Sequence, residues 1–448
     1  MSGVPDRGRK KRGVTSTIAK PGGITRRRFG SLGLGGLAVS TLGLTRAVFG
    51  QDTKPRVVVI GGGAGGASAA RAIAVDGRGS LDVTLIEPKT EYWTCFFSNL
   101  YLGGVEPAER IRHSYEALAA YGIELVHQMA DGIDADAKTV RLADGSDVPY
   151  DHLIVSPGIA FRYDQHEGYN EGDEAEVPHA WQAGEQTQLL KAQLEAMEDG
   201  GTFLLVPPPD PYRCPPGPYE RASMVATYFQ REKPNSKVLI VDSKAAFSKQ
   251  GLFEGGWARH YGPMIEWLPS DFTGGPVEVD VADKAVITGD GTRYEGAVMN
   301  FVPAQKAGLI AEKAGLTDKT GFCPMDPTSM ASALVPDITV LGDSTLAGDM
   351  PKSGFSANSQ AKVASMRIRA ALLNQPEFPA RYRNTCWSSI AEGDAVKVGA
   401  DYEPQDGRIT ATFKFISQVG EPEAERAAAA EEAQGWYASI TNDMFGGG

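Results

Sequence analysis

The sequence predicts an α/β protein in which buried parallel strands alternate with helices. The first observation is Arg56–Ile60, an apolar run that leads into a glycine-rich loop and an alanine-rich helix. Continuous apolar runs of this length are typical of strands buried on both faces. The second is another pair of such runs, Phe203–Val206 and Lys237–Asp242, which we expect to lie parallel in a second sheet. The third is Asp401–Ser417, which is typical of a β-hairpin and predicts an α+β part near the C-terminus.

Length and charge limit the class of protein. The chain has 448 residues, 42% of them hydrophobic and 22% charged, which is enough for two or three ordinary globular domains. The net charge is −12, but residues 1–50 hold ten Lys and Arg against one Asp, so they carry +9 and the remainder carries −21. So acidic a remainder repels nucleic acid and anionic membranes, and it attracts a basic partner.

The basic N-terminus is typical of an export signal. Arg26–Arg28 precede Phe29, the mildly apolar stretch 30–44 and the small residues before Gln51. An arginine pair in this arrangement indicates the twin-arginine route, which carries folded proteins; the alternative is a basic tail without a targeting role. We expect residues 1–50 to be the signal and the mature protein to be periplasmic. No other segment approaches the ~18 apolar residues of a membrane span, so no membrane insertion is expected.

A nucleotide-binding motif follows the first strand. Gly61, Gly63 and Gly66 have Gly-x-Gly-x-x-Gly spacing, and Glu87 ends the next predicted strand 21 residues later. The glycines allow a tight turn and let the backbone approach a pyrophosphate at a helix N-terminus, and the acid binds a ribose hydroxyl. The order of these elements, a strand, the glycines, a helix, a second strand and the acid, predicts a dinucleotide-binding site.

Two later segments indicate FAD. Tyr150–Gly158 reads as a turn, a buried strand and a small-residue loop that ends at Gly158. Ile338–Asp343 is another buried strand that ends in Gly342 and Asp343. Both resemble FAD fingerprints of the glutathione-reductase-like flavoproteins, and the resemblance implies that Asp343 binds the ribityl chain of FAD.

The same resemblance predicts the organisation of the chain. We expect two Rossmann-like domains of glutathione-reductase type, followed by a C-terminal α+β interface domain. The predicted parts are a signal (residues 1–50), an FAD domain in two segments (51–160 and 300–375), a second Rossmann-like domain (161–299) and the interface domain (376–448).

The turn after the second domain's first strand cannot cradle a nucleotide. Residues 207–222 read PPPDPYRCPPGPYERA. Proline supplies no N–H and fixes φ, so this turn lacks the donors and the freedom that a phosphate needs. We therefore expect no NAD(P)H site, and we expect the rigid turn to hold Cys214 at the flavin.

The chain has four cysteines, Cys95, Cys214, Cys323 and Cys386. An even number in an oxidising compartment invites disulfides, but four cysteines allow three full pairings and the number does not choose among them. No pair has CxxC spacing, so we expect no metal site. Cys95 lies in an aromatic stretch eight residues after Glu87 and is expected near the flavin, although a free cysteine can also be inert packing.

Five distinctive runs spread over the chain are YWTCFFSNLYLGG, PYRCPPGPYERAS, MPKSGFSANSQAKV, RNTCWS and GWYASITNDMF. Together they resemble the flavoprotein subunit of flavocytochrome c sulfide dehydrogenase. The resemblance implies that Cys95 is bonded to the 8α-methyl of FAD, and that Cys214 and Cys386 form a redox disulfide beside the flavin. The alternative for this pair is a purely structural disulfide. Cys323 is left over as a buried, unpaired thiol.

Two charged residues near these runs are further candidates. Lys352, before a helix that we expect to be amphipathic and capped by Ser353, Ser356 or Asn358, would stabilise the anionic reduced flavin; the alternative is a solvated lysine. Glu220 would serve as a base near the disulfide; the alternative is a first-turn acid favoured by the helix dipole.

The resemblance implies that sulfide is oxidised at the disulfide and that electrons pass through FAD to a haem. The chain has no CxxCH, so the haem belongs to a c-type cytochrome subunit in a heterodimer. The alternatives are a sulfide:quinone oxidoreductase and a non-catalytic flavin subunit that docks a cytochrome. The attacked sulfur, the sulfur product and the number of haems stay open.

Overall fold

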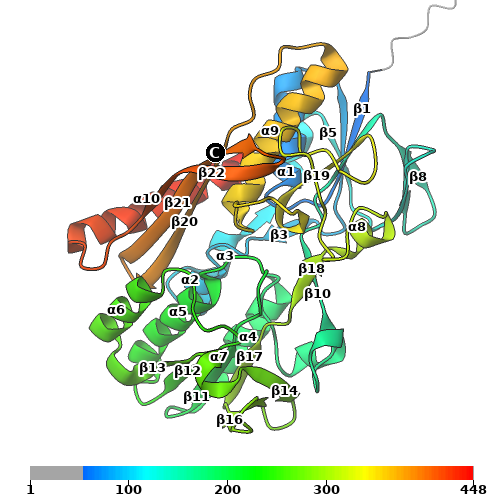
Figure 1. The fold of residues 1–448 in the computed structure, drawn as a ribbon. Helices are drawn as coiled ribbons and strands as arrows, with labels where there is room; N and C mark the ends of the chain where they lie inside the picture. The colour runs from blue at the N-terminus through cyan, green and yellow to red at the C-terminus, as the bar shows by residue number, and fades with distance from the viewer. Residues whose placement is uncertain (1–53, 447–448) are drawn as a thin grey trace, which may run out of the picture. The chain divides into compact units, whose positions relative to one another are not determined.

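The computed structural model describes residues 54–446. The signal predicted for residues 1–50 lies outside the described residues. These described residues form one compact unit, and Figure 1 shows their helices and strands.

The first sheet combines strands from two distant parts of the chain. Its five parallel strands run in the order β19 (Ile338–Val340), β9 (His152–Val155), β1 (Arg56–Ile60), β2 (Asp82–Ile86) and β5 (Ile123–Val126). The predicted strands at 56–60, 152–155 and 338–340 are thus neighbours. Because the strands are parallel, their carboxyl ends meet at one edge, where ligands bind in such sheets.

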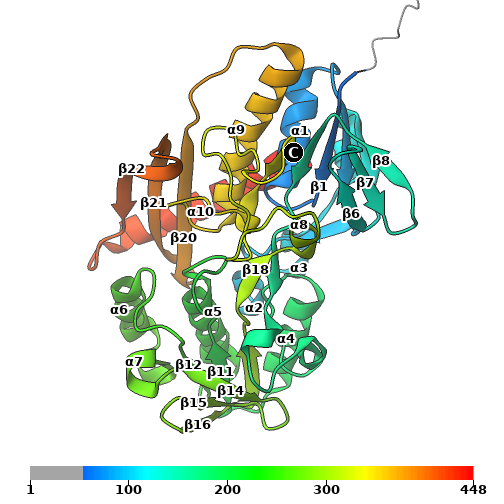
Figure 2. The same ribbon diagram turned by 45° about the vertical axis from the view of Figure 1, so that its right-hand side comes forward.

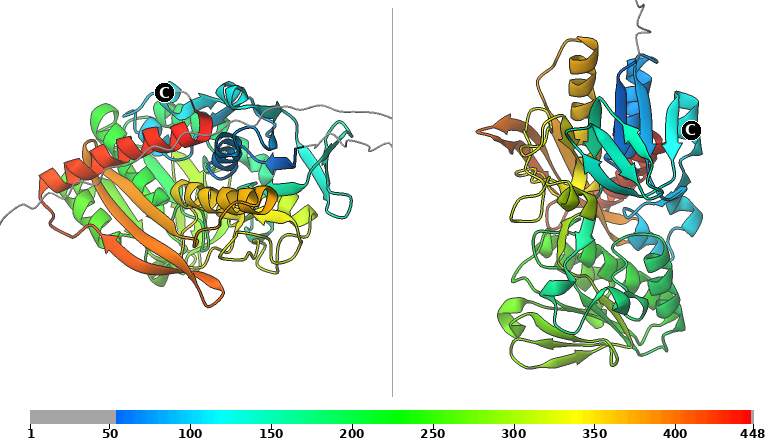
Figure 3. Two further views of the ribbon diagram at one scale, coloured as in Figure 1. Left: turned by 90° about the horizontal axis from the view of Figure 1, so that it is seen from above. Right: turned by 90° about the vertical axis from the view of Figure 1, so that its right-hand side faces the viewer.

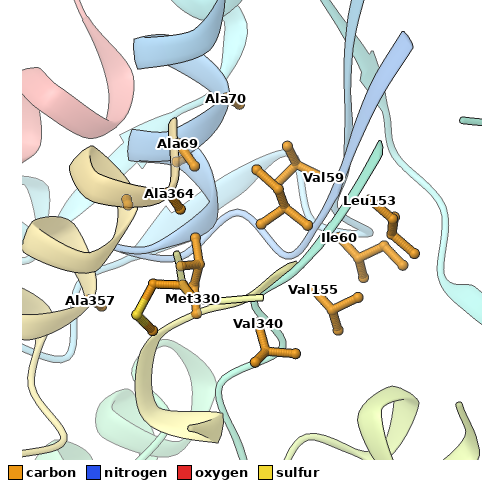
Figure 4. Packing of buried hydrophobic residues seen from close by; sticks show 14 of the residues in the cluster. Val59, Ile60, Ala69, Ala70, Leu153, Val155, Met330, Val340, Ala357 and Ala364 are labelled. Atoms are coloured by element: carbon orange, nitrogen blue, oxygen red, sulfur yellow. The ribbon is translucent and has the colours of Figure 1, made fainter. Parts of the chain in front are cut away.

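Two helices cover the first sheet closely. They are α1 (Gly66–Gly77) and α9 (Gly354–Leu373), and they contact each other. Figure 4 shows alanines of both helices, among them Ala69 and Ala364, beside Val59 of the sheet. Small side chains let the two helices approach, so the loop after β1 and the start of α9 come together at the same sheet edge.

Helix α9 differs from expectation in one respect. It begins after the loop that follows Asp343, as predicted, but only Lys362 and Ala371 are exposed in it. The expected amphipathic pattern is wrong because α9 lies between α1 and β20 (Tyr382–Ala391) and is covered on nearly all sides.

The second sheet is also parallel. Its strand order is β13 (Ile265–Leu268), β12 (Lys237–Val241), β11 (Thr202–Val206) and β17 (Val298–Phe301), so the predicted pairing of the runs at 203 and 237 is confirmed. Helix α5 (Gly217–Glu232) follows the proline turn and packs against this sheet and against α2 (Ser98–Leu102). Helix α6 (Gln250–His260) follows β12. In Figure 2 one end of β20 reaches toward α5 and α6.

The C-terminal part is a sheet backed by one helix. Strand β20 pairs with β21 (Asp394–Gln405), which forms the predicted hairpin with β22 (Arg408–Ile416). Helix α10 (Glu423–Phe445) runs across this sheet in the left view of Figure 3. Among the described residues, no helix combines the length and the apolar character that a membrane crossing needs.

The remaining elements are short. Two antiparallel sheets extend the parallel ones, β6–β8 beside the first and β14–β16 beside the second, and two strand pairs, β3 with β4 and β10 with β18, lie in the connections. The first of these sheets consists of β6 (Ala130–Asp134), β7 (Thr139–Leu142) and β8 (Asp147–Pro149), and the second of β14 (Pro276–Asp280), β15 (Ala285–Thr288) and β16 (Arg293–Glu295). The two pairs are β3 (Glu91–Trp93) with β4 (Arg112–Ser114), and β10 (Ile159–Phe161) with β18 (Gln305–Ala307). The other α-helices, α3, α4, α7 and α8, span Ala108–Ile111, Glu185–Ala196, Ser270–Thr273 and Leu309–Lys313.

Candidate active site beside a flavin cradle

One pocket brings three of the four cysteines together. It lies where α2, α5, β20 and the first turn of α9 meet, and Cys95, Cys214 and Cys386 all line it. Glu220 lines it as well. Its wall is aromatic, formed by Phe96, Phe97, Trp181, Phe355, Trp387 and Trp436. The site residues expected from distant parts of the sequence therefore share one space.

Cys214 is held rigidly by the proline turn. Its backbone is in the left-handed region, with φ of +60°. Its N–H donates to the carbonyl of Lys352 at 2.8 Å, and its carbonyl accepts from Gly217 at 2.8 Å. A non-glycine residue pays roughly 1 kcal/mol or more for such a backbone, and strain of this kind gathers at functional sites. The turn thus fixes Cys214 against the loop that precedes α9.

Cys386 lies on β20, an edge strand whose free side approaches α5. The side-chain amide of Asn384 donates to its Sγ at 3.4 Å. Cys214 and Cys386 line the same pocket and are free thiols in this structure. The structure therefore places the two cysteines together, and the disulfide between them stays a prediction.

Glu220 joins the two elements that carry these cysteines. It lies in the first turn of α5, and its Oε1 accepts from the N–H of Ser389 on β20 at 2.9 Å. Its Oε2 accepts from the side-chain amide of Asn99 at 2.8 Å. Burial raises the pKa of Glu220, and these two hydrogen bonds oppose the rise. A carboxyl with a raised pKa in a reactive pocket suits proton transfer.

Sequence reasoning missed Lys249, which precedes α6. Its Nζ donates to the carbonyl of Cys386 at 3.1 Å and to Oγ of Ser388 at 2.7 Å. Burial lowers the pKa of Lys249, and the charges of Cys386 and Glu220 raise it. The residue has no motif around it, and its position depends on α6 packing against β20, so no local pattern would have identified it.

Sequence reasoning also missed Arg221, which is buried behind Cys214. Its guanidinium donates to four oxygens, those of Asn99, Asn300, the His179 carbonyl and the Ala180 carbonyl. Burial lowers the pKa of Arg221 to about 9. A buried charge must be well hydrogen-bonded to be tolerated, and here it fixes the wall of the pocket.

The predicted glycine loop forms a cradle at the start of α1. Gly61 has φ of +97°, and a Cβ on Gly66 would lie 1.9 Å from the carbonyl oxygen of Gly61. At Gly63 the nearest atom to such a Cβ is 3.5 Å away, on Tyr92, so this side of the loop stays accessible. The helix start has no side-chain cap, and Glu87 accepts from the N–H of Gly62 at 2.8 Å. These features fit a pyrophosphate and a ribose.

Asp343 supplies a second fit to FAD. Its Oδ1 is buried and has no hydrogen-bond partner among the described residues. Burial raises the pKa of Asp343, whereas Arg213, 4.0 Å away, and Lys352 lower it. An unpaired buried carboxylate oxygen is costly, and a ligand hydroxyl would satisfy it. The predicted FAD contact of Asp343 therefore has a free acceptor to use.

The other predicted flavin residues lie around this cradle. Gly158 and Gly342 have φ of +67° and +74° at the ends of β9 and β19. Nζ of Lys352 donates to the carbonyls of Asp343 at 2.9 Å and Thr345 at 2.7 Å, and burial lowers its pKa to about 8. Lys352 is therefore a fixed, partly buried cation and not a solvated surface lysine.

Three smaller expectations concern the caps of α9 and Cys323. Oγ of Ser353 accepts from the N–H of Ser356 at 3.1 Å, so Ser353 is the cap. Ser356 and Asn358 are not caps, because both lie inside the helix, and Asn358 donates to Ser68 of α1 at 2.8 Å. Cys323 is buried, as expected, and burial raises its pKa to about 12.

Comparison with known proteins agrees with this arrangement. The family model named pyridine nucleotide-disulphide oxidoreductase matches residues 55–195 of the sequence. A second family model, named the central part of the sulfide dehydrogenase [flavocytochrome c] flavoprotein chain, matches residues 187–303. A third, named the flavin-binding part of flavocytochrome c sulphide dehydrogenase, matches residues 378–445.

Individual relatives point the same way. The sulfide dehydrogenase [flavocytochrome c] flavoprotein chain of Chlorobaculum thiosulfatiphilum is 58% identical over 44 residues, which are 10% of this chain and 90% of that sequence. The mitochondrial sulfide:quinone oxidoreductase of Dictyostelium discoideum is 20% identical over 323 residues, 69% of each chain. The solved sulfide:quinone oxidoreductase of Aquifex aeolicus superposes with a TM-score of 0.68 at 18% identity, over 87% of this chain and 92% of that one, and shows the shared fold.

The fold and the cradle define an FAD-binding flavoprotein of the pyridine nucleotide-disulphide oxidoreductase class. Within that class, the chain belongs to the family of the flavoprotein chain of flavocytochrome c sulfide dehydrogenase. The predicted resemblance and the predicted α/β fold of glutathione-reductase type are thereby confirmed.

Proposed function

We propose that the protein oxidises sulfide at a Cys214–Cys386 disulfide, with FAD as the electron acceptor and a c-type cytochrome subunit as the next carrier. The observation that carries the proposal is the common pocket of these two cysteines with Glu220 and Cys95. Support comes from the relatives, whose names all describe proteins that act on sulfide.

The reaction balances with two hydrosulfide ions. One HS⁻ attacks the disulfide, forms a persulfide on one cysteine and releases the other as a thiolate. A second HS⁻ removes the outer sulfur as HSS⁻ and leaves a thiol in its place. The chemistry that FAD supplies is acceptance of the electron pair released when the thiolate and the thiol close to a disulfide again. The net reaction is 2 HS⁻ to HSS⁻, one proton and two electrons.

Glu220 and Lys249 have complementary roles in this scheme. Glu220 accepts the proton of the entering hydrosulfide, because its raised pKa brings it toward the working pH. Lys249 lies against Cys386 and balances the negative charge that appears when the disulfide opens. Arg221 holds Asn99 and the carbonyl of Ala180, both in the pocket wall, by hydrogen bonds.

The flavin is held at both ends of the cradle. Glu87 and the start of α1 bind the adenosine side, and Asp343 binds the ribityl chain. We propose that Cys95, in the same pocket as the reactive pair, forms the covalent bond to FAD. A covalent flavin cannot be lost outside the cytoplasm, which agrees with the proposed twin-arginine export to the periplasm.

The cytochrome partner is favoured over a quinone by two observations. The matching family models are named for flavocytochrome c, and the −21 charge outside residues 1–50 suits a basic partner. A quinone acceptor is the second candidate, because the relatives from Dictyostelium discoideum and Aquifex aeolicus described above are both named sulfide:quinone oxidoreductase. A non-catalytic flavin subunit is the third, in which the cysteines have no redox role.

Substitution of the cysteines separates these functions. We expect Cys214→Ser to abolish sulfide-dependent reduction of cytochrome c, whereas Cys323→Ser, a buried cysteine outside the pocket, leaves it unchanged. The same assay with a soluble quinone in place of cytochrome c distinguishes the acceptor. Full activity of Cys214→Ser would contradict the proposed role of the disulfide, and a wild type that shows no sulfide-dependent activity would favour the non-catalytic subunit.

A further inference from the structure

Cys386 lies at the boundary of two separate spaces. It lines the aromatic pocket described above, and it also lines a second pocket, of about 230 Å³, on the sheet of β20, β21 and β22. Cys214 lines only the first of them. The second volume far exceeds the ~15 Å³ that one water molecule requires, so it admits small anions.

The strand geometry explains why Cys386 reaches the second pocket. Side chains alternate between the two faces of a strand, so Asn384 and Cys386 share one face of β20 and Thr385 and Trp387 share the other. The second pocket takes Asn384 and Cys386 together with Val398, the cross-strand partner of Cys386. The first pocket takes Thr385 and Trp387.

The rim of the second pocket favours anions. Two exposed charged residues line it, Asp349 and Lys414. Asp349 is neutralised by Arg408, whose guanidinium lies 2.6 Å from its Oδ1. Within residues 54–446, Lys414 takes part in no ion pair, so its charge is available to an entering anion. Coulombic attraction at such a rim raises the local concentration of HS⁻.

Asn384, which lines the second pocket, directs a hydrogen-bond donor toward Cys386. Oγ of Ser353 donates to Oδ1 of Asn384 at 2.6 Å, which turns the amide nitrogen of Asn384 toward Sγ of Cys386. A donor aimed at sulfur stabilises a thiolate, and a stabilised thiolate is the better leaving group when a persulfide is cleaved.

We propose that hydrosulfide enters and the sulfur product leaves through the second pocket, and that Cys386 is the sulfur attacked. The inference rests on the proposed function. HS⁻ forms a new S–S bond to Sγ of Cys386, the Cys386–Cys214 bond breaks, and Cys214 departs as a thiolate on the aromatic side. A second HS⁻ from the same pocket takes the outer sulfur as HSS⁻, and Cys386 leaves as a thiolate that takes up the proton of the persulfide and becomes a thiol.

Trapping of the persulfide tests which cysteine is attacked. The oxidised holoprotein is mixed with one equivalent of sulfide, and excess iodoacetamide stops the reaction before turnover is complete. Mass spectrometry of the peptides then locates the additional sulfur. The inference predicts the additional sulfur on the Cys386 peptide. Additional sulfur on the Cys214 peptide, with the flavin bleached, would overturn it while leaving the proposed function standing. If no persulfide forms and the flavin stays oxidised, both this inference and the proposed function are wrong.

Obstruction of the second pocket tests the route. Ala411 on β22 is half-buried and lines this pocket, so Ala411→Trp fills it; Lys414→Glu reverses the charge of its rim. We expect each variant to lower kcat/KM for sulfide at least tenfold and to leave flavin reduction by dithionite unchanged. The control is Lys319→Glu, which makes the same change of net charge at an exposed residue outside both pockets. Wild-type kcat/KM in both pocket variants would contradict the route.

Discussion

Oε1 of Glu220 accepts a hydrogen bond from the backbone N–H of Ser389 at 2.9 Å, and this bond joins helix α5 to strand β20. Cys214 lies just before α5, and Cys386 lies on β20. One carboxyl group therefore links the two elements that carry the proposed redox pair, and it can exchange a proton with whatever reacts between them.

Replacement of Glu220 tests this proton transfer. Glu220→Gln keeps an oxygen that can accept from Ser389 but cannot take up a proton, so we expect flavin reduction by sulfide to slow about 100-fold. Stopped-flow absorbance measures the rate, and thermal unfolding checks that the fold is retained. The matched control, Glu232→Gln, changes an exposed acid of the same helix and should react like the wild type. A purely structural Glu220 would lower thermal stability and leave the rate unchanged.

Replacement of Lys249 tests the charge balance at the opened disulfide. Burial raises the pKa of the Cys214 thiol well above its usual range, the charges of Cys386 and Glu220 raise it further, and Lys249 lowers it. We expect Lys249→Met to raise the pKa of the thiolate–flavin charge-transfer band by about one unit, equivalent to about 1.4 kcal/mol. Lys249→Arg should restore the wild-type value. A band that titrates identically in all three proteins would contradict this role.

The attachment of the flavin is testable through Cys95 and Asp343. We expect acid precipitation to leave flavin absorbance with the wild-type protein and to release it from Cys95→Ser. In the Cys95→Ser background, Asp343→Ala should also lose flavin on dialysis under native conditions, because it removes the free buried acceptor of the cradle. Acid-released flavin from the wild type would refute the covalent bond but not the role of Asp343.

A half-buried histidine predicts how stability depends on pH. Nε2 of His152 on β9 is 2.9 Å from Oγ1 of Thr339 on β19, and burial lowers the pKa of His152 to about 4 from 6.5. Between these values the unfolded chain binds the proton and the folded chain does not. Stability is therefore retained above about pH 6.5 and falls as the pH approaches 4, by up to about 3 kcal/mol.

Urea unfolding midpoints measured between about pH 7 and about pH 4 test this dependence of stability on pH. The two limits lie near the pKa of His152 in the unfolded chain and in the folded protein. We expect His152→Gln to lose less stability on acidification than the wild type. His127→Gln, a change at an exposed histidine, should lose as much as the wild type. Identical acid dependence in all three proteins would show that another group is responsible.

What the sequence could predict follows from distance along the chain. The cradle of Gly61, Gly63, Gly66 and Glu87 was predictable because strand, turn and helix follow one another within one local unit. The meeting of Cys214 with Cys386 came from the family resemblance, because spacing does not choose among three pairings. Lys249 was missed, since it reaches Cys386 only through the packing of α6 on β20.

The second pocket and the environment of α9 were also beyond the sequence. Pro215 and Pro216 of the turn line the pocket together with Asn384 and Cys386 of β20, which lie about 170 residues later in the chain. A helix pattern reports which residues are apolar, but α9 is covered by α1 on one side and β20 on another, so its polar residues are buried too. Both features arise from tertiary packing.

The most direct test of the central claim is an anaerobic titration of the oxidised holoprotein with sulfide, followed by flavin absorbance. The account predicts prompt bleaching or a long-wavelength thiolate–flavin band in the wild type, and neither change in Cys386→Ser. A flavin that sulfide leaves oxidised, yet dithionite reduces, would contradict the claim that this protein oxidises sulfide.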